Sequence, residues 1–208
     1  MESIISKLNI ISRDYINSDF SFHRKRPFLY VNSGTNISSA INLRKNDSQL
    51  VNVSQWFDDF WLYIELKFIP KTVPAKKIVP NIFFSLSVFQ GKADDTNKVQ
   101  LFRADWDNYE IPSNKHPQPH WHFYTRKDIE DFKKTFIELI DSTDDNFEDY
   151  IKNNKELIDI ERFHFAMNGQ WSQNNSDVHG IKSENELTNW YAGILNHLKK
   201  EIEYLVLK

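Results

Sequence analysis

Residues 60–69 read FWLYIELKFI, a run in which apolar side chains alternate with Tyr63, Glu65 and Lys67. Alternation with a period of two places the apolar residues on one face of a β-strand and the remaining residues on the other. Three further runs rich in aromatic and β-branched residues follow at 82–90, 99–106 and 119–124. Because the stretches between them carry turn residues and no helical pattern, we predict four consecutive strands joined as an antiparallel meander.

The alternation also predicts which side chains share a face of this sheet. The core face would carry Leu62, Ile64, Leu66, Ile82, Phe84, Leu86, Val88, Phe102, Ala104 and Trp106. The opposite face would carry Tyr63, Glu65, Lys67, Ser85, Ser87, Arg103 and Asp105 together with His120 and His122. An antiparallel sheet can keep such a polar face wet or in a cleft. A register shift of one residue would reverse every assignment, so this polar grouping is a hypothesis.

Helical patterns flank the strand region. Residues 2–11 carry isoleucine and leucine at helical spacing, which predicts a short amphipathic helix that packs on the body. The strongest pattern covers 183–206, where Ser183 and Glu186 form a capping box ahead of apolar residues at three- and four-residue intervals. Further helices are predicted within 126–158. Weaker extended segments are predicted at 28–32, 37–43 and 161–167.

These patterns together predict a single α+β domain spanning residues 1–208. Its antiparallel sheet of four to six strands would lie mainly within 28–124, with an additional strand at 161–167. The sheet would pack against C-terminal helices, mainly 126–158 and 183–206.

The composition excludes several classes of protein. The 208 residues include no cysteine, which excludes disulfides, thiolate nucleophiles and cysteine-ligated metal sites. Neither glycine-rich nucleotide-binding motif is present. No stretch approaches the roughly 18 to 20 apolar residues of a spanning helix, and the first residues lack a signal-peptide pattern. We therefore expect a cytoplasmic protein that makes no membrane contact.

A local basic cluster, His23-Arg24-Lys25-Arg26, stands out in a chain whose net charge is −3. This net charge gives no overall attraction to nucleic acid. We predict that the cluster forms a solvated surface turn. The alternative is that it contacts phosphate or an acidic partner.

The residues that suggest chemistry lie in HPQPHWHF, residues 116–123, which hold three of the seven histidines. If this segment is a strand, His120 and His122 share one face, while Trp121 and Phe123 lie on the other. Two neighbouring imidazoles on a polar face suit either metal ligation or general acid/base chemistry near neutral pH.

One interpretation is a site for a divalent metal such as zinc or manganese. The proposed ligands are His116, His120 and His122. Imidazole nitrogen and carboxylate oxygen are suitable ligands for these ions. Residues that could complete the shell are Asp105, Asp107 and His164.

The other interpretation needs no cofactor and uses the imidazoles directly. In RNA cleavage, one histidine takes the proton of the 2′-hydroxyl and another donates a proton to the leaving 5′-oxygen. Arg103 would stabilise charge on the phosphate, and Asp105 or Asp107 would orient an imidazole. Aromatic residues that could stack on unpaired bases are Trp106, Trp121 and Tyr124. For Trp121 and Phe123, however, a place in the core is the more common role.

The segments LFRADWDN, residues 101–108, and HPQPHWH, residues 116–122, together resemble a motif of TumE-like toxins from prokaryotic toxin–antitoxin pairs. The resemblance covers residues 99–124. It implies growth inhibition by RNA cleavage and neutralisation by a cognate antitoxin. The residues that match the family motif by position are Arg103, Asp105, His120 and His122.

We therefore expect a toxin or phage-defence protein that acts on nucleic acid as a histidine-based ribonuclease. Its expected catalytic residues are His120, His122, Arg103 and Asp105. An alternative is a non-catalytic subunit that binds an antitoxin or another defence-complex protein, because aromatic side chains are favoured anchors at interfaces. The third possibility is a metal enzyme with histidine ligands.

Overall fold

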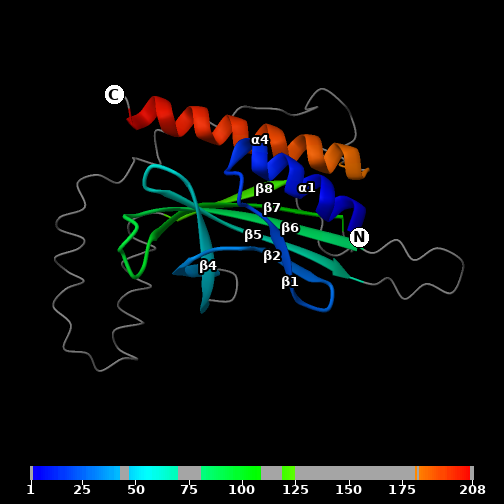
Figure 1. The fold of residues 1–208 in the computed structure, drawn as a ribbon, viewed down its shortest axis with the longest axis horizontal. Helices are drawn as coiled ribbons and strands as arrows, with labels where there is room; N and C mark the ends of the chain where they lie inside the picture. The colour runs from blue at the N-terminus through cyan, green and yellow to red at the C-terminus, as the bar shows by residue number, and fades with distance from the viewer. Residues whose placement is uncertain are drawn as a thin grey trace, which may run out of the picture.

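The computed structural model describes residues 2–42, 47–69, 81–108, 119–124, 181 and 183–206. Its helices and strands are α1 (Glu2–Tyr15), β1 (Phe22–Arg26), β2 (Leu29–Asn32), β3 (Asn36–Asn42), β4 (Asp47–Phe57), β5 (Phe60–Ile69), β6 (Asn81–Gln90), β7 (Val99–Asp107), β8 (His120–Phe123) and α4 (Glu184–Val206). The strand order is β1-β2-β5-β6-β7-β8, while β4 pairs with both β3 and β5. The predicted α+β class is confirmed, with eight antiparallel strands in this part of the chain instead of four to six (Figure 1).

The antiparallel meander predicted from the alternating runs is confirmed, because β5, β6, β7 and β8 are successive neighbours in the sheet. Strand β4 was not predicted. The basic residues 23–26 were predicted as a turn, which is wrong: they belong to strand β1 and are exposed there. The turn follows them, where Phe28 adopts a positive φ of 64°. The helices predicted within 126–158 and the strand at 161–167 lie outside the described residues.

Helices α1 and α4 lie side by side over one face of the sheet (Figure 1). The ten residues predicted for the core face all belong to, or pack against, the apolar cluster on this side. At the centre of the cluster, the buried Tyr191 hydroxyl of α4 lies 2.8 Å from Oγ of Ser12 on α1. The ring of Phe84 meets the Tyr191 ring edge-on. The two helices are therefore joined to each other and to the sheet within one core.

The start of α4 confirms the predicted capping box. The backbone N–H of Ser183 donates to the Glu186 carboxylate, and the backbone N–H of Glu186 donates to the Ser183 hydroxyl, each at 3.2 Å. These two bonds satisfy amides that have no partner within the helix. In the described part of the chain, no helix is long and apolar enough to cross a membrane.

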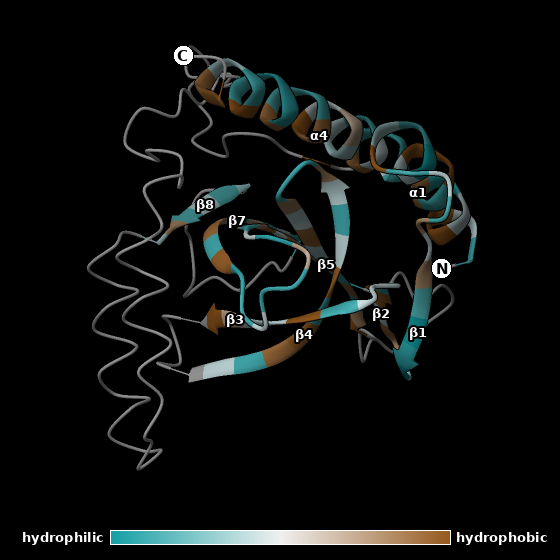
Figure 2. Cartoon of the chain, turned by 60° about the vertical axis from the view of Figure 1, so that its left-hand side comes forward, coloured by the Kyte–Doolittle hydropathy of each residue, from teal (hydrophilic) through white to brown (hydrophobic). Residues whose placement is uncertain are grey.

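The β3–β4 hairpin lies on the opposite side of the sheet from the helices (Figure 2). A second apolar cluster fills the space between the hairpin and the sheet. It includes Val51 and Val53 from β4, and Trp61 and Phe89 from β5 and β6. Polar contacts tie the hairpin to β7: the backbone N–H of Ile41, for example, donates to the Gln100 side chain at 2.6 Å. The face predicted to be polar is thus partly covered.

Candidate functional site

The register of the sheet places the predicted catalytic residues in two neighbouring rows. In the first row, Glu65, Ser85, Asp105 and His120 are direct cross-strand partners from β5 to β8. In the second row, the partners are Tyr63, Ser87, Arg103 and His122. All eight side chains therefore lie on the face opposite the helices, as the alternation predicted. Five of these residues are buried, namely Tyr63, Glu65, Ser85, Ser87 and Asp105.

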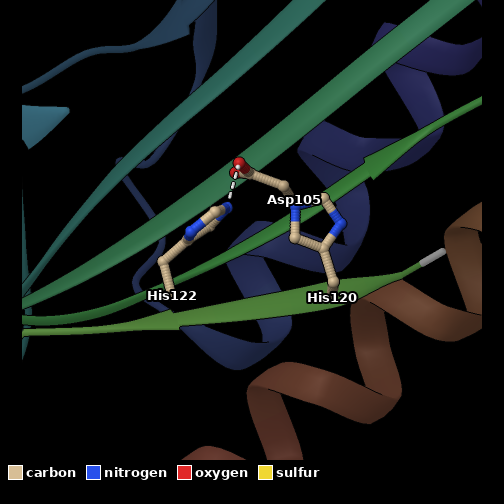
Figure 3. Close-up of side chains that lie close together, drawn as sticks. All are labelled: Asp105, His120 and His122. Carbon is tan, nitrogen blue, oxygen red and sulfur yellow. Dashed lines mark ion pairs between the residues drawn. The ribbon is translucent and has the colours of Figure 1, made fainter. Parts of the chain in front are cut away.

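The Asp105 carboxylate is the centre of this arrangement (Figure 3). Its Oδ2 accepts a hydrogen bond from Arg103 Nε at 3.0 Å and lies 2.9 Å from a terminal nitrogen of the same guanidinium. Nε2 of His122 lies 3.3 Å from the same oxygen. The side chain of Asp105 is 6% exposed, against 16% for Arg103 and 31% for His122. One buried carboxylate oxygen thus holds two side chains that are more accessible to solvent.

The surroundings of Asp105 favour its ionised form. Burial by itself raises the pKa of this carboxyl group, but the hydrogen bond from His122 and the charge of Arg103 oppose burial. Together with smaller contributions from the Ser85 hydroxyl and the charge of His122, they bring the pKa of Asp105 below its ordinary value. The carboxylate is therefore an acceptor only.

The ionised carboxylate determines which ring nitrogen of a neutral His122 carries the proton. A favourable contact between Nε2 and an ionised carboxylate requires the proton to be on Nε2. The lone pair of a neutral His122 imidazole then lies on Nδ1, on the side of the ring away from Asp105. A carboxylate that holds the proton on one ring nitrogen prepares the other nitrogen to accept a proton.

His120 and His122 project toward Asp105 from the same strand (Figure 3). The centroids of the two rings are 4.8 Å apart, and the planes meet at 73°. One ligand atom from each of Asp105, His120 and His122 lies within 4.8 Å of the others. Two imidazoles and one carboxylate are a donor set suited to zinc, manganese or iron. These three side chains therefore have the composition and spacing to hold a divalent cation.

The structure brings together all four residues predicted as catalytic, namely Arg103, Asp105, His120 and His122. The third predicted metal ligand, His116, lies outside the described residues, as does His164. Asp107 is one row farther along the same face, where its cross-strand partner is Phe83.

The predicted base-stacking aromatics do not line this site. Trp106 is buried in the core beneath the helices, and Trp121 packs against that core. Tyr124 is 2% exposed, and its hydroxyl donates to the Ile41 carbonyl at 2.9 Å. The expectation that Trp106 and Tyr124 stack on bases is therefore wrong, because neither ring presents a free face.

Further polar residues surround the site. Among them, Tyr63, Glu65, Lys67 and Ser87 were predicted to share this face, but no role in the site was predicted for them. The Tyr63 hydroxyl donates to Glu65 at 2.9 Å, and Glu65 also forms an ion pair with Lys67. Gln100 donates to the Ser87 hydroxyl at 3.1 Å. These contacts satisfy groups whose burial would otherwise be costly. The polar alternation along β5 and β6 was the signal that could have identified them.

Comparison of this chain with protein-family models, curated proteins and solved structures found no match.

Proposed function

We propose that this chain cleaves RNA by general acid/base catalysis, in a toxin or phage-defence setting. The observation that carries the proposal is the shared carboxylate oxygen of Asp105, which holds Arg103 and His122 beside His120. In this assignment His122 is the base, His120 the acid and Arg103 the group that stabilises charge on the phosphate. Asp105 is a positioning residue, because it acts through its two partners.

The reaction needs only the substrate and these side chains. Nδ1 of His122 takes the proton of a 2′-hydroxyl, and the 2′-oxygen forms a bond to phosphorus. The bond from phosphorus to the 5′-oxygen breaks, and a protonated His120 gives its proton to that oxygen. The products are a 2′,3′-cyclic phosphate and a free 5′-hydroxyl. Because RNA supplies the nucleophile, the mechanism fits a chain that has no cysteine.

Incubation of the purified protein with single-stranded and structured RNA tests this proposal. We expect wild type to cleave RNA in the presence of chelator and to leave DNA of the same sequence intact. His120→Ala and His122→Ala should each lower the cleavage rate by about 10²-fold or more. His197→Ala is the matched control, because His197 lies on α4, which packs on the other face of the sheet. Equal cleavage by wild type and both site variants would contradict the assignment and favour a non-catalytic, partner-binding subunit.

A metal enzyme is the second candidate, and the observation that favours it is the set of three ligand atoms within 4.8 Å. The bound cation would polarise a phosphate oxygen or activate a water molecule. This candidate predicts about one equivalent of zinc or manganese by elemental analysis and loss of both metal and activity in Asp105→Asn. Cleavage that survives complete removal of metal would exclude it.

A further inference from the structure

The first row of the site, which contains Asp105 and His120, extends across the sheet beyond the catalytic residues. Through Glu65, the row continues to Val31 on β2 and His23 on β1. A third row on the same face, here called the basic row, runs through Arg26, Leu29, Lys67, Phe83 and Asp107. The basic row therefore places two cationic side chains and one aromatic side chain on the face that carries the site.

Three side chains of the basic row are accessible to solvent. Arg26 is exposed, the Lys67 side chain is 37% exposed, and Phe83 is half-buried. Nζ of Lys67 lies 5.0 Å from the centroid of the Phe83 ring. Phe83 is thus a partly exposed aromatic on this face, and the sequence patterns did not identify it.

Two observations place Arg26 on the site face of β1. Its partner Leu29 belongs to the apolar cluster beneath the β3–β4 hairpin. Burial raises the pKa of Tyr63, a residue of the site face, and the charge of Arg26 partly opposes that effect. Arg24 lies on the other face of the same strand, because its partner Tyr30 belongs to the helix-side core.

Among the described residues of this face, the accessible charge is mainly cationic. The carboxylates of Glu65 and Asp105 are buried and paired with Lys67 and Arg103. Asp107, at the end of the basic row, is half-buried. An ammonium group has three donors, so Lys67 can contact Glu65 and a phosphate oxygen together. Arg26 forms no ion pair with any described residue.

We propose that single-stranded RNA crosses this face of the sheet, with Lys67 and Arg26 binding its phosphates and Phe83 stacking on a base. The inference rests on the proposed function, because it supplies the substrate path to the same site. Neighbouring strands are about 4.8 Å apart, so β5 and β1 lie about 10 Å and 19 Å from β7 along the sheet. A segment of a few nucleotides covers this span. Phosphate contacts and base stacking bind without sequence preference.

Equilibrium binding of a fluorescently labelled oligouridylate tests the path separately from catalysis. Each phosphate contact on a single strand contributes about 0.7 to the slope of log affinity against log salt concentration. Arg26→Gln/Lys67→Gln should therefore weaken binding and reduce the slope by about 1.4. The matched control is Arg13→Gln/Arg24→Gln, which removes the same charge from α1 and from the helix-side face of β1. Phe83→Leu should weaken binding without changing the slope.

The outcomes separate this inference from the proposed function. Binding that depends on Arg26 and Lys67 without any cleavage would support the path and contradict catalysis. Cleavage by a protein whose binding slope is the same in the site-face and control variants would support catalysis and overturn the path. Failure of wild type to bind the oligouridylate at low salt would also overturn the path. Thermal unfolding of each variant shows whether the fold is retained.

Discussion

Replacement of Asp105 by asparagine removes the charge that holds the site together. The substitution conserves shape, but it replaces the carboxylate that contacts Arg103 at 2.9 Å and His122 at 3.3 Å with a neutral amide. Removal of one partner from a fully buried ion pair costs about 3–5 kcal/mol. Arg103 and His122 retain some access to water, so solvent screening reduces the cost. We expect the free energy of unfolding to fall by about 2–3 kcal/mol.

Urea unfolding at neutral pH, followed by circular dichroism, measures this loss. With a slope of about 2–3 kcal/mol per molar urea, the midpoint should fall by about 1 M. In the double variant Asp105→Asn/Arg103→Met, the uncompensated guanidinium is also removed. Its destabilisation should therefore be smaller than the sum of the single effects by at least about 1 kcal/mol.

The exposed pair between Lys199 and Glu203 on α4 provides the control for this experiment. Its atoms are 4.0 Å apart, and both side chains are nearly half exposed. Glu203→Gln should therefore change stability by no more than about 0.5 kcal/mol. If Asp105→Asn costs as little as Glu203→Gln, the carboxylate does not organise the site and the reasoning from its contacts fails.

Three further predictions follow from the described contacts. Because the pKa of Asp105 is depressed in the folded state, its stabilising effect is present above about pH 4 and is lost as pH falls through the folded pKa. Urea titrations from about pH 5 to about pH 2 should therefore show a larger loss of stability for wild type than for Asp105→Asn. Tyr191→Phe should cost about 1 kcal/mol in the same assay, because it removes the 2.8 Å contact with Ser12, and prior replacement of Ser12 by alanine should reduce that cost. Asn32→Ala should lower the unfolding free energy by about 2–3 kcal/mol, since it leaves the buried backbone N–H of Ile64 without its 2.8 Å acceptor; an unchanged thermal midpoint would contradict this.

The main strands could be predicted because their apolar residues alternate over ten residues or nearly so. Strand β5 has this pattern, and its partner β6 repeats it. Strand β1 could not be predicted in the same way, because four of its five residues are exposed and none of the four is apolar. Its extended conformation depends on pairing with β2, a contact that local propensity does not encode. Strand β4 carries a signal that the prediction missed, since Val51 and Val53 are both buried.

The site was predictable as a set of residues on one face but not as a geometry. Alternation placed Arg103 and Asp105 on the same face of β7, whereas the pairing of β7 with β8 decides that His122 lies opposite Arg103. A shift of one residue in that register would turn both histidines toward the helices. The same pairing turns Trp121 toward the core. A partly exposed aromatic residue on the site face is instead Phe83, which the alternation of β6 could have identified.

The amino-acid sequence by itself determined the α+β class, the antiparallel meander and the side chains that share each face, because burial of apolar surface follows the period of the strand. Only the tertiary structure decided that one oxygen of Asp105 binds both Arg103 and His122, and that Arg26 and Lys67 lie in the neighbouring row. Arg103 and Asp105 lie two residues apart on β7, whereas His122, Lys67 and Arg26 come from three other strands. Their positions depend on register and on the packing of the whole sheet, and no local pattern in the chain specifies either.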